Sequence, residues 1–251
     1  MLRETVFAAV VAGIIAALVL TFVQSVWVTP LILQGETYED AAEAPISHHD
    51  SVSASTAHHH DPAAWKPQDG LERTLFTFAA NLLMGVGYAL VLVALYLLWR
   101  EPKTALGGAA YGLAGFVVFF AAPGLGLPPE LPGTAVAELA VRQEWWVLTA
   151  ATTAVGLILF FSTPKLWVRV LALAVLVAPH LMPAPQPAIE RSLAPAELQQ
   201  QFRLATTACS ALFWLSLGIA SRSLSEYSPW PRARQISLKS RRSRRSWVKT
   251  Q

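Results

Sequence analysis

Long apolar stretches that carry no charged residue constrain this chain more than any other feature. A helix needs about 20 residues to cross the hydrocarbon core of a bilayer. Four of the stretches meet that length easily, and the last two are short or polar-ended. Each lies between charged residues that mark where it would reach water. The six stretches are Thr5–Gly35, Thr74–Trp99, Thr104–Pro129, Trp145–Pro164, Val170–Ile189 and Leu204–Ser221.

The composition agrees with a protein embedded in lipid. Charged residues make up 14% of the 251 residues, against about 25% in a typical soluble domain, and the mean hydropathy is +0.43. We therefore expect an all-α fold, a polytopic integral membrane helix bundle with about six transmembrane helices. The first helix should be retained rather than cleaved as a signal peptide, because its apolar part continues to Trp27 without a clear A-x-A cleavage site.

The chain divides into four parts by composition. A polar, acidic segment with histidines follows the first apolar stretch, and a segment rich in serine and arginine follows the last one. Neither segment is apolar enough to bury a core, so we expect disorder in much of both. The parts are a first transmembrane helix at 1–33, an outer loop rich in histidine and acids at 34–74, a five-helix remainder of the bundle at 75–226 and a basic cytoplasmic tail at 227–251.

Basic residues are distributed unevenly between the two ends of such a bundle. With six spans, the N-terminus, the turns after the second and fourth spans and the C-terminal tail share one side, which holds 14 of the 19 lysines and arginines. The other side holds 13 of the 16 acids and all six histidines. The positive-inside rule then places both termini in the cytoplasm. We expect a multi-pass protein of the bacterial inner membrane.

Prolines recur near the outer ends of the first, third and fifth spans, at Pro30, Pro123 and Pro179. Because proline lacks a backbone N–H and clashes with the preceding turn, each of these helices should end or kink there. The even-numbered spans begin with an acid and then enter the similar stretches TFAAN, TAATTA and ATTACSA. One interpretation is three tandem helical hairpins in the same orientation. The alternative is that biased composition produces the similarity.

The stretch from Ala105 to Trp146 predicts a membrane hairpin with a rigid outer turn. Its first part is apolar and rich in Gly and Ala, which favours tight packing against another helix. A run of prolines and glycines then forms an elbow that carries Glu130. Thr134 is positioned to cap the following helix, and Trp145 and Trp146 are typical of a membrane interface.

Several of these motifs resemble the CbtA family of predicted cobalt transporter subunits. The resemblance covers Met1 to about Met182, and the elbow is its most specific part. It implies a membrane subunit of a divalent-metal uptake system, with cobalt destined for cobalamin synthesis. It also implies a small single-span partner, CbtB, with a His-rich end. The family usually has five helices, so six is a departure. The motifs are GLAGF, AAPGLGLPPELPG, RQEWW, QSVWVTPLILQGETYED and AWKPQDGLERTLFTFAANLLMGVGYAL.

The outer loop supplies the first candidate metal ligands. Neutral imidazole and carboxylate together suit Co, Ni, Zn and Cu, and a loop on the outer side could collect such ions. The alternative is a solvated linker that binds metal only incidentally. The candidate histidines are His48, His49, His58, His59 and His60.

Acids near the membrane supply the second set of candidates. Glu36 and Glu39 lie three residues apart and would share a helical face, although they could equally be ordinary interfacial acids. Glu130, Glu138 and Glu144 should converge with them over the outer mouth of the bundle, with His180 as a nitrogen ligand or a structural residue. Two polar residues within the spans, Gln24 and Asn81, would either hydrogen-bond between helices or offer oxygen ligands along an ion path.

Enzyme motifs are absent from the sequence, which has no G-x-x-x-x-G-K-[ST], H-E-x-x-H or G-x-S-x-G. We therefore expect no catalytic residue, no tightly bound cofactor and no nucleic-acid partner; the metal would be cargo. The expected partners are membrane lipids and the His-rich CbtB-like subunit, and a homo-oligomer stays open. The alternative function is a non-transporting accessory or scaffold protein whose outer loop buffers metal.

Overall fold

The structure, a computed structural model, describes residues 2–43, 67–189 and 191–226, and it is helical except for short connections. Three of the helical segments depart from α-helical geometry: η1 and η2 are π-helical and η3 is a 3-10 turn. In chain order the segments are α1 (Leu2–Val23), η1 (Gln24–Val28), α2 (Thr29–Glu43), α3 (Leu71–Leu98), α4 (Ala105–Phe116), η2 (Val117–Ala121), α5 (Ala122–Gly126), α6 (Leu139–Ser162), α7 (Leu166–Val177), η3 (Ala178–Leu181) and α8 (Ala196–Glu226).

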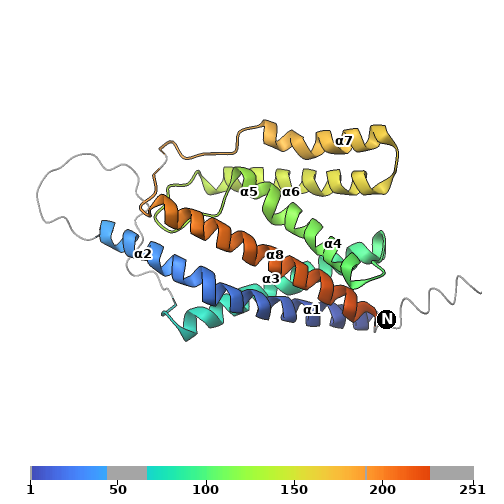
Figure 1. Ribbon diagram of the computed structural model, residues 1–251, viewed down its shortest axis with the longest axis horizontal. Helices are drawn as coiled ribbons and strands as arrows, with labels where there is room; N and C mark the ends of the chain where they lie inside the picture. The colour runs from blue at the N-terminus through green and yellow to red at the C-terminus, as the bar shows by residue number, and fades with distance from the viewer. Residues whose placement is uncertain (1, 44–66, 190, 227–251) are drawn as a thin grey trace, which may run out of the picture.

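Five helices in the described part of the chain are long and apolar enough to cross a membrane, which confirms the predicted all-α membrane bundle. The sixth apolar helix, Leu166–Leu181, is shorter. An extended segment follows it and leads back to the start of α8 (Figure 1). The five long spans are Arg3–Ala42, Leu71–Leu98, Ala105–Gly124, Leu139–Ser162 and Ala196–Leu224.

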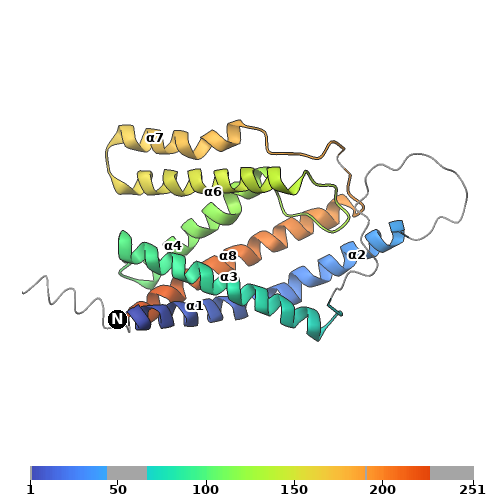
Figure 2. The ribbon, with the colours of Figure 1, turned by 180° about the vertical axis from the view of Figure 1, so that it is seen from behind.

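The start of α1 and the end of α8 lie at the same end of the bundle, as Figures 1 and 2 show. A hydrogen bond supports this arrangement, because Arg222 near the end of α8 donates from Nη2 to the carbonyl of Lys103 just before α4 at 3.0 Å. The described chain therefore makes an even number of passes along the bundle. We call the end that holds Lys103 and Arg222 the inner end and the opposite end the outer end.

Each of the three prolines changes the helix that contains it. At Pro30 and Pro123 the preceding turn widens, so that Thr29 N–H donates to Gln24 O and Ala122 N–H donates to Val117 O, five residues back. The wider turn accommodates the proline ring, which would clash with the carbonyl four residues earlier. At Pro179 the helix tightens into η3 and ends. The predicted helix ends near Pro123 and Pro179 are confirmed, whereas at Pro30 the helix widens locally and continues.

The first helix continues beyond the expected boundary at residue 33. It runs without interruption through Arg3–Ala42, 40 residues, or about 60 Å at 1.5 Å per residue. This is about twice the hydrocarbon thickness, so α2 projects past the outer end. α3 likewise begins at Leu71, inside the segment assigned to the loop. The acids of 34–43 suggested a loop, but glutamate and alanine are good helix formers.

Two pairs of helices approach closely through glycines. Where α1 crosses α3, a Cβ on Gly85 would lie 2.7 Å from the carbonyl oxygen of Gly13. Where α4 crosses α8, a Cβ on Gly112 would collide with the carbonyl oxygen of Trp214, and Gly218 lies in the same contact. Small residues let membrane helices approach in this way, because lipid provides no hydrophobic force between them.

Aromatic rings fill the space between α3, η2 and α8. Phe119 stacks on Trp214 with ring centroids 5.5 Å apart and an interplanar angle of 4°. Tyr88 lies 4.6 Å from Trp214 and 4.9 Å from Phe119. This cluster joins the glycine contacts in holding α1, α3, α4 and α8 together as the body of the bundle.

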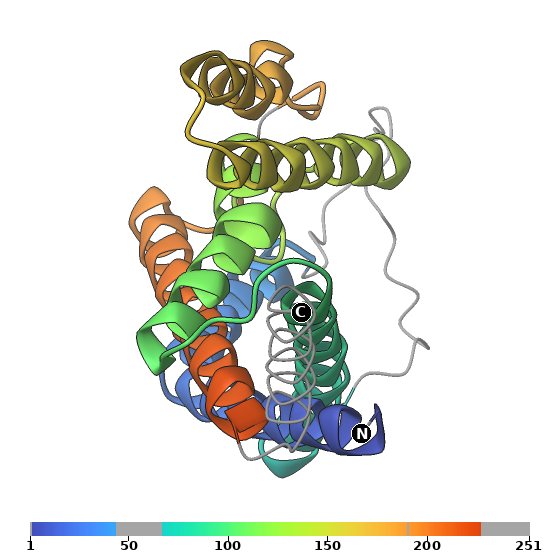
Figure 3. The same ribbon diagram turned by 90° about the vertical axis from the view of Figure 1, so that its right-hand side faces the viewer.

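The packing does not repeat in three equivalent hairpins. α1 packs along α3, the next helix in the chain, but α4 packs along α8 and α6 packs along α7. As Figure 3 shows, the pair α6 and α7 lies on one side of the other four helices. The expected repeat is therefore wrong at the level of packing, because the glycines of α4 face α8. The similar stretches reflect composition.

The elbow, residues 127–138, folds over the outer end of the bundle. Gly133 has φ +74°, a value that favours glycine, and it pairs with the segment before α8 through Leu193 N–H, which donates to Gly133 O at 3.3 Å. Leu131 is only 2% exposed and packs against Gly35 of α2. Its N–H donates to Oε1 of Gln199 at 3.2 Å. The elbow thus closes the outer end with a buried leucine.

Gly112→Val should destabilise the bundle by about 1–3 kcal/mol, because the added atoms force α4 away from α8. The melting temperature in detergent should fall, together with the yield of monodisperse protein. Gly87→Ala in α3 is the matched control, since a Cβ there meets no atom within 4 Å and alanine favours helix. Equal melting temperatures for Gly112→Val and the wild type would contradict the close α4–α8 contact.

Candidate functional site

The five loop histidines lie outside the described residues. His48, His49, His58, His59 and His60 all belong to the segment 44–66. Their part in metal collection stays a prediction. The remaining six candidates are described, and all lie on elements at the outer half of the bundle.

Glu36 is held by an arginine. Nη1 of Arg73 donates to Oε1 of Glu36 at 3.0 Å, and Nη2 donates to both carboxylate oxygens at 3.1 Å. Nε of Arg73 also lies 3.1 Å from Oδ1 of Asp69. The pair ties the end of the long first helix to the start of α3, so a metal ion would have to displace Arg73 before binding Glu36.

The other membrane-proximal candidates do not gather around a single point. Glu39 lies one turn beyond Glu36 on α2 and is partly buried, whereas Glu138, just before α6, and Glu144, on α6, are exposed. His180 lies in η3 with its ring edge-on to Trp145, at 6.2 Å between centroids. Within the described ranges no three His, Cys, Asp or Glu side chains form a group that could hold a metal ion.

Glu130 is the candidate acid that lines a pocket under the elbow. It is partly buried in the elbow, and together with Arg142, Gly126 and Gln186 it lines a small pocket. Burial raises the pKa of Glu130 above its ordinary value, while the charges of Arg142 and Arg203 act in the opposite direction. A metal ion would therefore compete with a proton at Glu130 up to a higher pH than at an ordinary glutamate.

Sequence reasoning missed a polar cluster around Gln199. Its buried side chain donates from Nε2 to Thr134 Oγ1 at 2.6 Å and to Ser192 Oγ at 3.1 Å. Thr134 therefore does not cap α6, which begins five residues later. The sequence signal was the glutamine run 199–201 at the start of a membrane span, where a polar residue usually has a partner.

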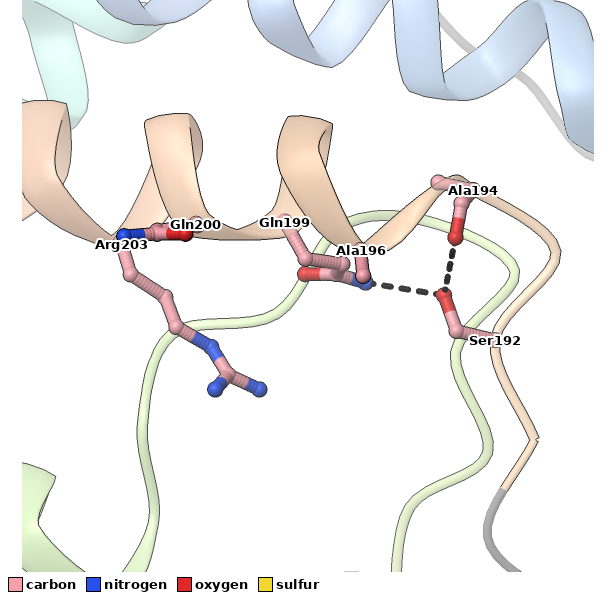
Figure 4. Close-up of a pocket in the computed structure, with 6 residues that line it drawn as sticks. All are labelled: Ser192, Ala194, Ala196, Gln199, Gln200 and Arg203. Carbon is pink, nitrogen blue, oxygen red and sulfur yellow. Dashed lines mark hydrogen bonds between the residues drawn. The ribbon is translucent and has the colours of Figure 1, made fainter.

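A cavity of about 460 Å³ adjoins this cluster at the first turns of α8. Figure 4 shows Gln199 directed toward Ser192, with Arg203 projecting from the same side of the helix one turn later. Arg203 is the one charged residue among the lining residues. A positive guanidinium without a lining acid does not suit a bare metal ion, so we do not assign metal entry to this cavity.

The polar residues within the first two spans contact each other. Asn81 of α3 donates from Nδ2 to Thr21 Oγ1 at 3.0 Å and to Gln24 Oε1 at 2.6 Å. This cluster lies at the start of the π-helical segment η1 and ties α1 to α3. The contact favours the structural interpretation, hydrogen bonding between helices, over an ion ligand.

These features define a multi-pass helical membrane protein whose polar groups gather at the outer end. Residues 2–225 match the family described as "Probable cobalt transporter subunit (CbtA)", and the chain belongs to this family. The match includes the five long apolar helices, the shorter helix Leu166–Leu181 and the elbow. No curated protein and no solved structure matches the chain.

Metal binding at Glu130 should weaken as the pH falls, beginning at a pH above the ordinary 4.5 of a glutamate. The proton is held more tightly than usual, so it competes with the metal at higher pH. Cobalt affinity can be measured by calorimetry in a background in which all six histidines, His180 included, are alanine, which removes imidazole titration.

The fall in cobalt affinity at low pH, the acid limb of the affinity curve, should disappear in Glu130→Gln. It should stay in the control Glu197→Gln, whose carboxylate is exposed at the start of α8. Arg203→Gln should move the limb to higher pH, because it removes a charge that lowers the pKa of Glu130. An unchanged acid limb in Glu130→Gln would remove Glu130 from the site.

Proposed function

We propose that this protein is the membrane subunit of a divalent-metal uptake system whose cargo is cobalt destined for cobalamin synthesis. The family match over residues 2–225 carries the proposal, and the family is one of transport subunits rather than enzymes. The five long apolar helices and the sixth shorter one supply the membrane body that such a subunit needs.

The proposed location is the bacterial inner membrane, with both termini in the cytoplasm. Among the described residues, four basic residues lie at the outer ends of the helices, against six near the inner ends: Arg3, Arg100, Lys103, Lys165, Arg169 and Arg222. Their excess supports a cytoplasmic inner end by the positive-inside rule. The outer end, with Glu36 and Glu130, would then face the periplasm, where scarce metal arrives.

Two sets of ligands would act in sequence. The loop histidines would collect metal, but ordering flexible backbone costs about 1–2 kcal/mol per residue, so their affinity should be modest and should fall below about pH 6. Glu130 is fixed on the proline-rich elbow and loses less entropy on binding. It is therefore the better entry ligand of the candidate acids.

The chain would work with other molecules. It has no nucleotide-binding motif, so transport would depend on a gradient or on a partner. We propose membrane lipids and a small single-span CbtB-like subunit as its partners. The His-rich end of that subunit would add soft nitrogen ligands. Affinity alone cannot select cobalt, because nickel and copper bind most such sites more tightly.

The second candidate function is a non-transporting accessory protein whose outer loop buffers metal. The observation that favours it is the lack, in the described part of the chain, of a group of three metal-ligating side chains. A buffer needs only the loop histidines, whereas a transporter also needs a route through the bundle. The uptake measurement below separates the two.

Green fluorescent protein fused after Gln251 should fluoresce, and alkaline phosphatase fused at the same place should be inactive, because the C-terminus is proposed to be cytoplasmic. Both reporters inserted between Ser53 and Ala54 should behave in the opposite way. An active phosphatase after Gln251 would overturn the orientation and the even number of crossings.

Cells that make this protein with its candidate small partner should accumulate radiolabelled cobalt faster than cells with the partner alone. Replacing the five loop histidines by alanine should lower uptake mainly at scarce metal. Glu130→Gln should lower it at every metal concentration, and Glu197→Gln is the control. Unchanged uptake in the presence of this protein would favour the buffer function.

A further inference from the structure

One face of α6 carries a line of residues that the proposed entry site does not use. Arg142, Trp145, Thr149, Thr153 and Gly156 follow one another at spacings of three or four residues, which places them on the same side of a helix. Trp145, Thr149, Thr153 and Gly156 are buried in the bundle. The line runs from the outer end of α6 toward the middle of the membrane.

The outer end of this line opens at the pocket under the elbow. Glu130 and Arg142 line that pocket, and so does Gly126. A Cβ on Gly126 would collide with the indole ring of Trp145, so the indole lies directly beside the pocket. The first buried group of the line therefore adjoins the pocket that contains Glu130.

Three polar atoms along the line are buried without a hydrogen-bond partner. They are Nε1 of Trp145, Oγ1 of Thr149 and Oγ1 of Thr153, and the two threonines are 0% and 1% exposed. A buried polar group without a partner costs about 1–3 kcal/mol. Three such groups on one helix face are expected only where water or a ligand satisfies them.

Thr152, the residue before Thr153, makes the hydrogen bond that a threonine in a helix commonly makes. Thr152 donates from Oγ1 to the carbonyl of Leu148 at 2.8 Å, within its own helix. Thr149 and Thr153 occupy the same helix but do not form such a bond, and their hydroxyl oxygens stay available on the buried face. Their role is therefore different from that of an ordinary threonine in a membrane helix.

The π-helical segment η2, which packs against α6, contains a carbonyl group without its usual helical donor. Ala122 N–H donates to Val117 O, and Pro123 has no N–H, so the carbonyl of Val118 lacks its usual helical donors. Val118 is buried. Backbone without helical hydrogen bonds at membrane depth is tolerated where it is buried in protein or lines a water-filled cavity.

The line closes toward the inner end at Gly156. A Cβ there would meet the side chain of Leu176 at 2.6 Å and the carbonyl of Ala172 at 3.2 Å, both from α7. From Arg142 to Thr153 the rise is about 16 Å, or roughly half of the hydrocarbon core. The polar groups thus extend through the outer half of the membrane and end at an apolar contact.

We propose that Trp145, Thr149 and Thr153, which we call the α6 seam, line the outer half of the path for a partly hydrated divalent cation. This inference rests on the proposed function and assigns a route to it. The cation would enter beside Glu130 and pass along the hydroxyl oxygens of Thr149 and Thr153, with a water molecule on the indole N–H. Neutral oxygens bind such an ion weakly, as passage requires.

The first test removes the hydroxyl groups without changing side-chain volume, in Thr149→Val and Thr153→Val. If the hydroxyls line a path, cobalt uptake should fall roughly tenfold in the double variant, while the melting temperature stays the same or rises because unpartnered polar atoms are lost. Thr206→Val is the matched control, since Thr206 on α8 also has a buried hydroxyl without a partner and lies outside the seam. Its uptake should not change.

Two results of this first test would contradict the proposal. If the double variant takes up cobalt at the wild-type rate, the seam is dry packing and the proposal is wrong. A loss of uptake together with a lower melting temperature would also overturn it, because the hydroxyls would then support the fold rather than the ion.

The second test does not depend on uptake and therefore stays informative if the proposed function fails. Cys209 is the chain's sole cysteine, so Cys209→Ala gives a background for Thr149→Cys and Thr153→Cys. A cationic methanethiosulfonate reagent added from the outside should modify both, because thiolates form only where water is present. Ala205→Cys is the buried control, since Ala205 is 0% exposed within the apolar core.

Cobalt added before the reagent should slow modification of the two seam cysteines. Reaction rates equal to that of Ala205→Cys would show that no water reaches the seam and would overturn the proposal. Modification that cobalt leaves unchanged would show a water-filled seam that does not hold the cation, which also overturns it.

Discussion

The hydrocarbon core offers no hydrogen-bond partner to a backbone N–H or C=O, and the rest of this structure depends on that constraint. It explains why the chain crosses the membrane as helices and why each irregular segment within them has a local cause. Pro30 and Pro123 each impose a π-helical turn, in η1 and η2. Both turns contact α8, and each has a polar or aromatic cluster beside it. Local breaks in the backbone pattern thus coincide with the places where side chains from distant helices meet.

The sequence predicted the elements of the fold better than their packing. Uncharged runs mark the spans because lipid tolerates few charges, and prolines mark the kinks because their effect is local. The choice of neighbours is not local: α4 packs on α8 because Gly112 faces Gly218, more than 100 residues later. Nothing in the sequence indicated that Leu131 would be buried at the outer end of the bundle, because an apolar residue in a proline-rich turn could equally face lipid. The continuation of α2 to Glu43 was hidden because acids favour both loops and exposed helices.

In the candidate site, too, local features could be predicted from the sequence, whereas contacts between distant residues could not. The elbow motif located Glu130 at the outer end, and its burial follows from the proline-rich turn that carries it. The partner of Glu36 was not predictable, because Arg73 reaches it only after α1 and α3 cross. Gln199 donates to Thr134, 65 residues earlier, and the α6 seam is recognised by atoms that lack partners, a property that no sequence pattern displays. Its threonines sit in a run, TAATTA, in which Thr152 is ordinary and its neighbours are not.

Glu36 and Glu130, the two candidate acids near the contact between α2 and the elbow, differ in what a metal ion would have to displace. Leu131 packs against Gly35, and these residues are the chain neighbours of Glu130 and Glu36, so the stem of the histidine-containing loop meets the elbow at this contact. Glu36 has its charge compensated by a bidentate arginine. Glu130 is instead attracted by Arg142 and Arg203 through charge alone, against the cost of burial. A cation at Glu36 must first separate an existing ion pair, whereas at Glu130 it competes with a proton once the pH is low enough. The cost of breaking the ion pair between Glu36 and Arg73 is thus a reason to propose the elbow pocket, beside the indole of Trp145, as the place of entry.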